Sequence, residues 1–333
     1  MSTITTIKDI AEKAHVSSST VSRVLNNDAT MNVTDDTRRK IYAAAEELNY
    51  QKRSLKSLHS KGIVALVQWY STDKELGDLY YRAIRWGIEN QLEASQYEVK
   101  HFLPSDTLPS MSDFAGIVAL GKFSTAQLEV LKQSGKPLVI VDQDVLGEGV
   151  SCVVPDFANG IDRIIHYMQA AGYQTVGMIA GVEETSDGQA LNDPRRQLFP
   201  QLAVDAGFST PAIYAAPFTV EGGYQAMEVA ITAGKLPDAF FVANDSMAIG
   251  AIKALQNAHI NIPDDVSLFG FNNLAIGLYL NPTLSSVHVP TETMGATAVT
   301  MLIALSEEKL PQPSKLTVAT SLKLRQSSTR KEH

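Results

Sequence analysis

The sequence predicts a small all-α head followed by an α/β body of two doubly wound parallel-sheet lobes. Apolar residues recur at helical spacing through the first fifty positions, while apolar strands alternate with helices from Gly62 onward. The chain has 333 residues, which is enough for a small head and a two-lobed body.

The stretch from Thr6 to Asn26 is expected to form two short helices joined by a tight turn. Thr6 can cap the first helix, with Asp9 as the acidic residue that reciprocates the cap. Ser17 can cap the second helix. The positions expected to face inward are Ile7, Ile10, Ala11, Ala14, Val21, Val24 and Leu25.

The outward face of the second helix is polar, with Ser18, Ser19, Ser22, Arg23 and Asn26. Such a row suits an element laid in the DNA major groove, where Arg pairs with guanine, Asn with adenine and Ser with base edges or phosphate. An ordinary helical hairpin with a solvated polar face would show the same spacing. The pattern alone leaves both interpretations open.

A third helix is expected from Asp35 to Leu48, capped by Thr34, with Ile41, Ala44 and Ala45 on its apolar face. Its outward residues Arg38, Arg39 and Lys40 are either solvated charges or phosphate contacts. Residues 51–62 have the composition of a linker.

The formal net charge of −8 is distributed unevenly along the chain. Residues 1–61 hold ten Lys or Arg against seven Asp or Glu, whereas the remainder is strongly acidic. A locally positive head supplies the field that phosphate binding requires, and an acidic body limits non-specific adhesion. The asymmetry favours a DNA-binding head.

The body is expected to repeat strand–helix units with apolar strands, which predicts parallel sheets covered by helices and a ligand cleft at the carboxyl ends of the strands. The expected strands are 63–69, 97–102, 114–120, 137–142, 150–154, 175–180, 212–214, 239–243, 266–271, 285–289 (crossing back) and a closing strand 317–324. The expected helices are 79–93, 125–134, 159–171, 195–206, 222–233, 246–258 and 291–306.

Several of these segments resemble one known family. The runs Ile7-Lys-Asp-Ile-Ala, Val16-Ser and Thr20-Val-Ser-Arg-Val-Leu-Asn are similar to the headpiece signature of the LacI/GalR family of bacterial transcriptional repressors. Phe241-Val-Ala-Asn-Asp with Met247-Ala-Ile-Gly, the turn from Asp156 to Gly160 and Val266-Ser-Leu-Phe-Gly-Phe resemble its core domain, which shares its fold with periplasmic sugar-binding proteins.

The resemblance implies a helix-turn-helix DNA-binding domain at 1–50, a hinge at 51–62 and an effector-binding and dimerisation domain at 63–330. Its first lobe is expected at about 63–158 and 290–315, and its second at about 159–288 and 316–330. The implied DNA-binding residues are Thr6, Ser18, Ser19, Thr20, Ser22, Arg23, Asn26, Thr34, Arg38 and Leu58.

The chain departs from the family pattern in the turn and the hinge. His15 stands where the family usually has Gly, and Lys52 and Arg53 replace a Pro-Asn pair. Leu58, the candidate for insertion into the minor groove, comes one residue early. The basic hinge residues could instead make mainly electrostatic contacts with phosphate.

The resemblance also implies a set of effector-binding residues: Trp69, Asn159, Arg195, Phe218, Asn244 and Asn272. Arg195 matches an arginine that clamps effector oxygens, and Phe218 matches an aromatic placed against a sugar face. The asparagines could read hydroxyls, although Asn after a strand is often only a turn-former. The family often has Asp at the position of Asn272, and Trp69 could instead belong to the core or a dimer interface.

Catalytic motifs are absent from the sequence, which lacks a Gly-rich phosphate loop, a Gly-x-Ser-x-Gly elbow and a His-Glu-x-x-His motif. The histidines are scattered and Cys152 is the single cysteine, so no enzyme activity, metal or cofactor is expected. The start of the chain has no basic and apolar signal-peptide pattern, and no segment is long and apolar enough to span a membrane. A cytoplasmic protein is expected, against the alternative of a stand-alone sugar-binding transport protein.

We therefore expect a homodimeric transcriptional regulator, a repressor that reads a near-palindromic double-stranded DNA operator and is gated by a small sugar effector. Trp69-Tyr-Ser, Asp78-Leu-Tyr-Tyr and Ile84-Arg-Trp-Gly-Ile-Glu resemble the galactose and β-galactoside operon repressors of lactic acid bacteria. A galactoside effector is therefore expected. A regulator of the same family with a different ligand is the alternative.

Overall fold

The computed structural model describes residues 7–14, 16–25, 37, 40, 41, 44, 60–70, 79–106 and 108–329. The chain divides into two compact units, Met1–His59 and Ser60–His333, each described here by itself.

The first unit contains α1 (Ile7–Ala14) and α2 (Ser18–Leu25), which pack around a small apolar core. Ser17 Oγ accepts the Thr20 N–H at 3.1 Å, so the expected cap of α2 is confirmed. Thr37, Lys40, Ile41 and Ala44 are helical. The expected inward positions Ile10, Ala11, Ala14, Val21, Val24, Ile41 and Ala44 are all buried.

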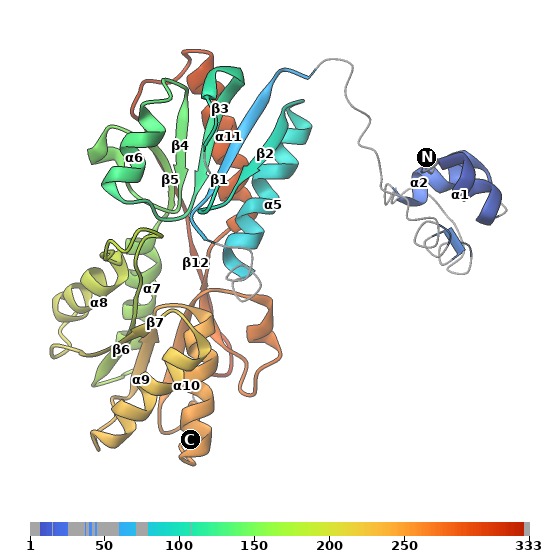
Figure 1. Ribbon diagram of the computed structural model, residues 1–333. Coiled ribbons are helices and arrows are strands. Elements are labelled where there is room, and N and C mark those ends of the chain that lie inside the picture. Colours follow the sequence, from blue (N-terminus) through green and yellow to red (C-terminus); the bar gives the residue numbers. More distant parts are fainter. Residues whose placement is uncertain are drawn as a thin grey trace. The chain divides into compact units, whose positions relative to one another are not determined.

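Two six-stranded sheets form the framework of the second unit within the described residues (Figure 1). The first sheet defines the N-lobe and has the order β11-β5-β4-β3-β1-β2, with every neighbouring pair parallel. Its strands are β1 (Ile63–Gln68), β2 (Glu98–Phe102), β3 (Phe114–Leu120), β4 (Leu138–Val141), β5 (Ser151–Pro155) and β11 (Lys315–Val318).

The second sheet defines the C-lobe and has the order β12-β10-β9-β8-β6-β7, parallel except for the antiparallel pair β10 and β12. Its strands are β6 (Val176–Val182), β7 (Ala212–Pro217), β8 (Ala239–Val242), β9 (Ser267–Asn272), β10 (Ser285–His288) and β12 (Ser321–Lys323). The predicted pair of α/β lobes with mainly parallel sheets is confirmed.

The helices cover both sheets. They are α5 (Leu79–Ala94), α6 (Thr125–Lys132), α7 (Phe157–Ala170), α8 (Pro194–Asp205), α9 (Val220–Thr232), α10 (Asp245–Asn257) and α11 (Thr291–Ser306). Two helix pairs are close because glycines leave room for a neighbouring backbone. A Cβ added at Gly87 of α5 would meet the Glu292 carbonyl oxygen of α11 at 2.1 Å, and one at Gly223 of α9 would meet the Met247 carbonyl oxygen of α10 at 2.0 Å.

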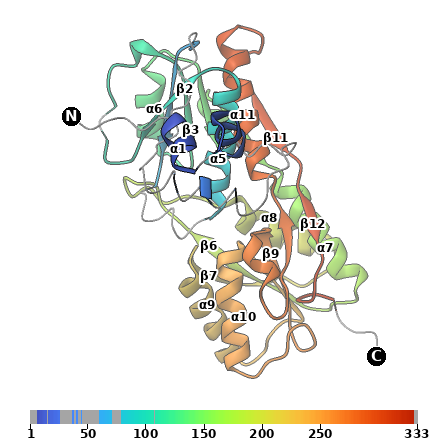
Figure 2. The ribbon, with the colours of Figure 1, turned by 90° about the vertical axis from the view of Figure 1, so that its right-hand side faces the viewer.

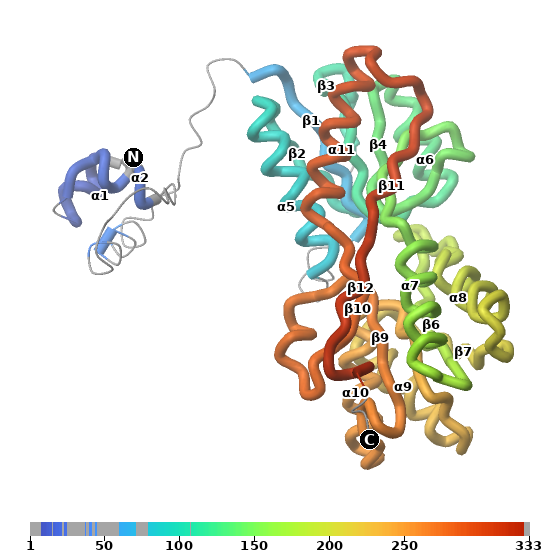
Figure 3. The backbone as a smooth tube through the Cα atoms, turned by 180° about the vertical axis from the view of Figure 1, so that it is seen from behind, coloured from blue at the N-terminus to red at the C-terminus, as the bar shows by residue number. Residues whose placement is uncertain are grey.

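The chain crosses between the lobes three times within the described residues: from β5 to α7, from β10 to α11 and from β11 to β12. Figures 2 and 3 show β11 and β12 as successive segments that run from one lobe into the other. The prediction of one closing strand at 317–324 was therefore wrong. Since the chain changes lobes after Val318, it pairs with β5 first and with β10 afterwards.

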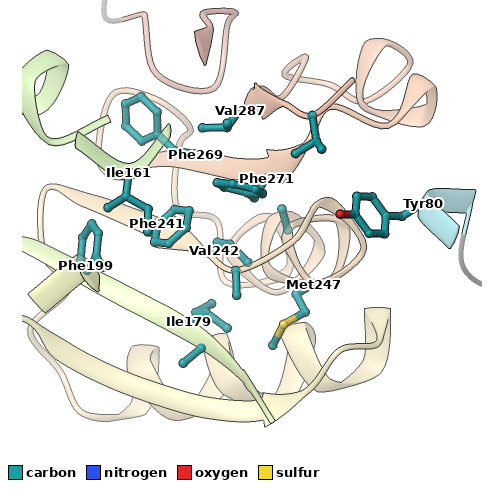
Figure 4. Close-up of a cluster of buried hydrophobic side chains, with 14 of the residues drawn as sticks. Tyr80, Ile161, Ile179, Phe199, Phe241, Val242, Met247, Phe269, Phe271 and Val287 are labelled. Carbon is teal, nitrogen blue, oxygen red and sulfur yellow. The ribbon is translucent and has the colours of Figure 1, made fainter. Parts of the chain in front are cut away.

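The largest apolar cluster lies mainly inside the C-lobe, where Phe199, Phe240, Phe241, Phe269 and Phe271 are fully buried. Figure 4 shows several of these side chains and the ring of Tyr80, which points toward them from the first turn of α5. Cys152 is buried in a second cluster on the other face of the N-lobe sheet, as expected for a small apolar side chain. No helix among the residues described is long and apolar enough to cross a membrane.

Candidate functional site

A cleft of ≈ 480 Å³ lies between the two lobes and is lined by residues from both. Lys122 follows β3, Asp142 follows β4, Asp156 follows β5 and Glu183 follows β6. The carboxyl ends of parallel strands meet at one edge of each sheet, and here the two edges face each other. The volume is within the usual range for a site that holds a small molecule.

Arg195 is the central side chain of the C-lobe wall and is only 9% exposed. Its Nε donates to both carboxylate oxygens of Asp193, at 2.9 and 3.0 Å, and its Nη1 donates to the Ala243 carbonyl at 2.7 Å. No described residue accepts a hydrogen bond from Nη2. Asp193 also accepts the Arg195 backbone N–H and caps α8, so the Asp-Pro-Arg sequence places the pair at the start of this helix.

Three aromatic rings surround the guanidinium. Its Cζ lies 5.2 Å from the ring centre of Phe157, 4.9 Å from that of Phe218 and 5.5 Å from that of Phe271. Burial lowers the pKa of Arg195, but the charges of Asp193, Glu183 and Asp142 and the hydrogen bonds to Asp193 outweigh this effect. The pKa ends above its ordinary value, so the side chain stays cationic.

Asp142 is the corresponding centre of the N-lobe wall. Tyr80 and Tyr81 donate their hydroxyls to its two carboxylate oxygens at 2.7 Å each, and Lys122 Nζ lies 2.9 Å from Oδ2. Lys122 also donates to the Asp142 carbonyl. Burial, followed by the charge of Asp142, raises the pKa of Tyr81 well above its usual value, so this hydroxyl stays a donor.

Glu183 is a half-buried carboxylate at the C-lobe side of the cleft. Burial raises the pKa of Glu183, and the nearby cations Lys122 and Arg195 lower it. The acids Asp142 and Asp193 raise it further, so the pKa ends above its ordinary value. The carboxylate therefore lies near groups from both lobes. Among the described residues it has no hydrogen-bond partner and no ion pair.

Phe218 and Asn244 lie beside Arg195. Phe218 stacks on the guanidinium and covers Gly181, where a Cβ would meet its ring at 2.0 Å. Asn244 is buried next to Ala243, and its Oδ1 accepts the Met247 N–H at 2.8 Å to cap α10. Arg195, Phe218 and Asn244 thus lie together in the C-lobe, but of the three only Arg195 lines the cleft.

Asn159, Asn272 and Trp69 are placed differently. Asn159 is exposed on α7, where its Oδ1 accepts from Arg163 Nε at 2.6 Å. Asn272 ends β9 opposite His288 with a φ of 106°, a left-handed conformation that Asn tolerates better than most residues. None of the three lines the cleft that Arg195 lines.

Trp69 follows β1 in the N-lobe and packs against Gly121, where a Cβ would meet its ring at 1.6 Å. Its ring centre lies 5.9 Å from that of Tyr81. Its Nε1 is buried without a hydrogen-bond partner among the described residues, as is Gln68 Oε1.

In the head, Ser18, Ser19 and Arg23 of α2 are exposed and Thr20 is half-buried. Ser17 Oγ lies 2.7 Å from Ser19 Oγ and 2.8 Å from Thr20 Oγ1, so the start of α2 carries linked hydroxyls. The predicted positions Thr6, Asn26, Thr34, Arg38 and Leu58, the turn residue His15 and the side chain of Ser22 lie outside the described residues.

A loop of the C-lobe bonds to the start of α6 in the N-lobe. Ser124 Oγ donates to Asp187 Oδ2 at 2.6 Å, and Gln127 Nε2 donates to Ser186 Oγ at 2.7 Å. Ser124 also caps α6 by accepting the Gln127 N–H. These bonds and the three chain crossings connect the lobes, so they hold the observed arrangement of the cleft.

Sequence reasoning missed Lys122, Asp142 and Glu183. Each follows an apolar strand, at the position where polar groups of such folds meet. Inspection of the first charged residue after each predicted strand would have found Lys122 and Glu183, and Asp142 is the last residue of the predicted strand 137–142. No group of three His, Cys, Asp or Glu in the part of the chain that the structure describes could hold a metal ion.

Two family models match the chain. Residues 6–52 match the bacterial regulatory proteins of the lacI family, and residues 165–328 match the periplasmic binding protein-like domain. The first match covers α1 and α2, and the second covers most of the C-lobe.

Curated relatives are similar to this chain over nearly its whole length. The HTH-type transcriptional regulator GalR of Streptococcus thermophilus is 40% identical, with 97% of this chain and 99% of the relative covered. GalR of Lacticaseibacillus casei is 37% identical over 98% and 100%, and GanR of Bacillus subtilis is 33% identical over 97% and 99%.

Solved structures share the fold. A transcriptional regulator CelR–cellobiose complex is 24% identical, with a TM-score of 0.72 over 97% of this chain and 100% of that one. The lac repressor dimer bound to operator and the anti-inducer ONPF is 21% identical, with a TM-score of 0.70 over 98% and 100%.

Replacement of Ser124 by Ala tests the contact between the lobes. The change removes a helix cap and the bond to Asp187, so we expect the free energy of unfolding in urea to fall by about 1 kcal/mol. Amide hydrogen exchange at residues 184–190 should also become faster. Thr219→Ala is the matched control, because it removes a cap within the C-lobe alone. Equal exchange at 184–190 in both variants would contradict a bond between the lobes.

Proposed function

The chain belongs to the LacI family of bacterial regulatory proteins and is a DNA-binding transcriptional regulator. We propose that it represses a sugar-utilisation operon and that a sugar bound in the interlobe cleft controls this repression. The observation that carries the proposal is Arg195, a buried cation that lines a cleft between two lobes and whose Nη2 bonds to no described residue. Aromatic rings beside a charged donor suit a sugar, which has both apolar faces and hydroxyls. Chromosomal DNA as the target makes the cytoplasm its place of action.

Operator reading is assigned to α2. Its exposed Ser18, Ser19 and Arg23 form a polar face on a helix held by a buried apolar core. Such a helix fits the major groove, where Arg recognises guanine through two hydrogen bonds. Thr6, Thr20, Ser22, Asn26, Thr34 and Arg38 complete the proposed interface, together with Leu58 in the hinge.

A homodimer fits an operator of near-palindromic sequence, because the two-fold axis of the protein then matches that of the DNA. Large apolar side chains are exposed on α5, where Trp86 is 57% exposed, and at residues 276–279, where Tyr279 is 83% exposed. Figures 1 and 3 show α5 and the orange segment after β9 on the same side of the core. We assign this side to the contact between protomers, since exposed apolar patches mark interfaces.

Gating follows from the position of the cleft. A sugar that contacts Arg195 in the C-lobe and Asp142 with its partner Lys122 (together the Asp142 group) in the N-lobe favours one relative orientation of the lobes. It changes operator affinity only as far as it binds the two orientations differently. A galactoside is the proposed ligand, from the resemblance of the segments around Trp69, Tyr81 and Trp86; a regulator of the same family with another sugar is the alternative.

Arg23→Ala tests the reading helix. Loss of the contact with a base should weaken operator binding by about 1–3 kcal/mol and relax the preference at one base pair. Fluorescence anisotropy of labelled DNA from upstream of the gene measures both effects. Lys8→Ala removes the same charge from α1 and should weaken binding equally for all sequences. An unchanged affinity and preference for Arg23→Ala would show that α2 does not read the bases.

Arg195→Lys tests the cleft. Lysine keeps the charge beside Asp193 but lacks the planar fork that bonds Asp193, Ala243 and a ligand together. Operator binding without sugar should be unchanged, while the sugar concentration that alters binding should rise at least about tenfold. The matched control is Arg196→Lys at the exposed neighbour. An unchanged response in Arg195→Lys would remove Arg195 from the effector site.

Tyr279→Asp tests the proposed dimer. A charge placed in an apolar interface loses its hydration on association, so the dimer should dissociate at least about tenfold more readily. Sedimentation equilibrium measures this constant. Val229→Asp, at an apolar position on α9 that is 60% exposed, is the control and should leave association unchanged. An unchanged dimer dissociation constant in Tyr279→Asp would show that the interface lies elsewhere.

A further inference from the structure

The charged side chains of the cleft are almost all paired with one another. Eight described residues that line it are charged: Lys122, Asp142, Asp144, Asp156, Glu183, Asp193, Arg195 and Lys315. All three cations are already bonded to aspartates. Lys122 lies 2.9 Å from Asp142, Arg195 lies 2.9 Å from Asp193 and Lys315 lies 2.6 Å from Asp144.

Two carboxylates remain after this pairing. Asp156 caps α7, since its Oδ1 accepts the Asn159 N–H at 3.0 Å. The side-chain carboxylate of Glu183 has neither a hydrogen bond nor an ion pair among the residues that the structure describes, whereas its backbone carbonyl accepts the Leu191 N–H at 3.1 Å. A half-buried carboxylate without a partner is costly, and it is an acceptor available to whatever enters the cleft.

Glu183 also lies close to the side chains that face a ligand. Its charge raises the pKa of Arg195 in its own lobe and that of Tyr81 in the other. A molecule that occupies the space between Arg195 and the Asp142 group therefore passes within reach of the Glu183 carboxylate.

This arrangement accepts a neutral ligand and opposes an anionic one. A sugar hydroxyl can donate to Glu183, and a hydrogen bond to a carboxylate is about twice as strong as one between neutral groups. A phosphate group carries about −1.5 to −2 charges and needs a cation that is not already neutralised. The described lining residues offer none, and they include two more carboxylates than cations.

We propose that Glu183 is a specificity-determining residue of the cleft, which accepts hydrogen bonds from the hydroxyls of an unphosphorylated sugar and excludes sugar phosphates. The inference rests on the proposed function of the cleft as an effector site, and it adds the chemical class of the effector. The regulator would thus respond to sugar that enters the cell without phosphorylation.

The test is isothermal titration calorimetry of the full chain at pH 8, where carboxylates are ionised. The probes are galactose, glucose and lactose, with galactose 6-phosphate, glucose 6-phosphate and lactose 6-phosphate as their charged counterparts. We expect one neutral sugar to bind at least about a hundredfold more tightly than its phosphate. In Glu183→Gln, the neutral sugar should bind about ten- to a hundredfold more weakly. The ratio of the dissociation constants of the sugar phosphate and the neutral sugar should fall about tenfold.

Glu184→Gln is the matched control, because Glu184 is the exposed neighbour and does not line the cleft. It should leave affinity and preference unchanged, and operator binding by each variant verifies the fold. If Glu183→Gln only damaged the structure, the binding of the neutral sugar and of its phosphate would weaken equally. That result would overturn the assignment. Tighter binding of a sugar phosphate by the unmodified protein would overturn the neutral class while preserving a sugar effector. No binding of any sugar by a protein that binds its operator would overturn the effector function itself.

Discussion

The ion pair of Arg195 with Asp193 is the interaction on which the C-lobe wall of the cleft depends. One guanidinium joins the start of α8, the Ala243 carbonyl after β8 and aromatic rings from α7, from the loop after β7 and from β9. A buried cation without its carboxylate would cost several kcal/mol, so the pair must stay together. Because the pair is fixed, the polar atoms that face the cleft have defined positions before a ligand arrives.

Each lobe has closely packed helices, and few side-chain bonds join the two lobes. Glycine contacts bring α5 against α11 in one lobe and α9 against α10 in the other, so that helix backbones touch. Among the described ion pairs, none joins the two lobes. Side-chain hydrogen bonds between the start of α6 and the C-lobe are those of Ser124, Thr125 and Gln127 with the single loop 186–189. Small differences in ligand contact can therefore select an orientation, as sensing requires.

Most of the fold was predictable from local patterns. Apolar runs after Gly62 located every described strand of the body, although 317–324 proved to be two strands in different sheets. Helical spacing correctly placed Ile10, Val21 and Ile41 in the core of the head. The division of 317–324 was not predictable, because strand propensity does not report the sheet in which a strand finds its partner.

The sequence by itself determined the head, the alternation of strands and helices, and the candidate Arg195, since periodicity and motif spacing are properties of neighbouring residues. Only the tertiary structure decided which polar groups share the cleft. Asp142 follows a strand of the N-lobe, whereas Glu183 and Arg195 belong to the C-lobe, and the three meet because the carboxyl edges of two sheets face each other. Only three-dimensional placement shows that aspartates pair with the three described cations of the cleft, while the Glu183 carboxylate has no partner among the described residues, because charge pairing depends on distance in space.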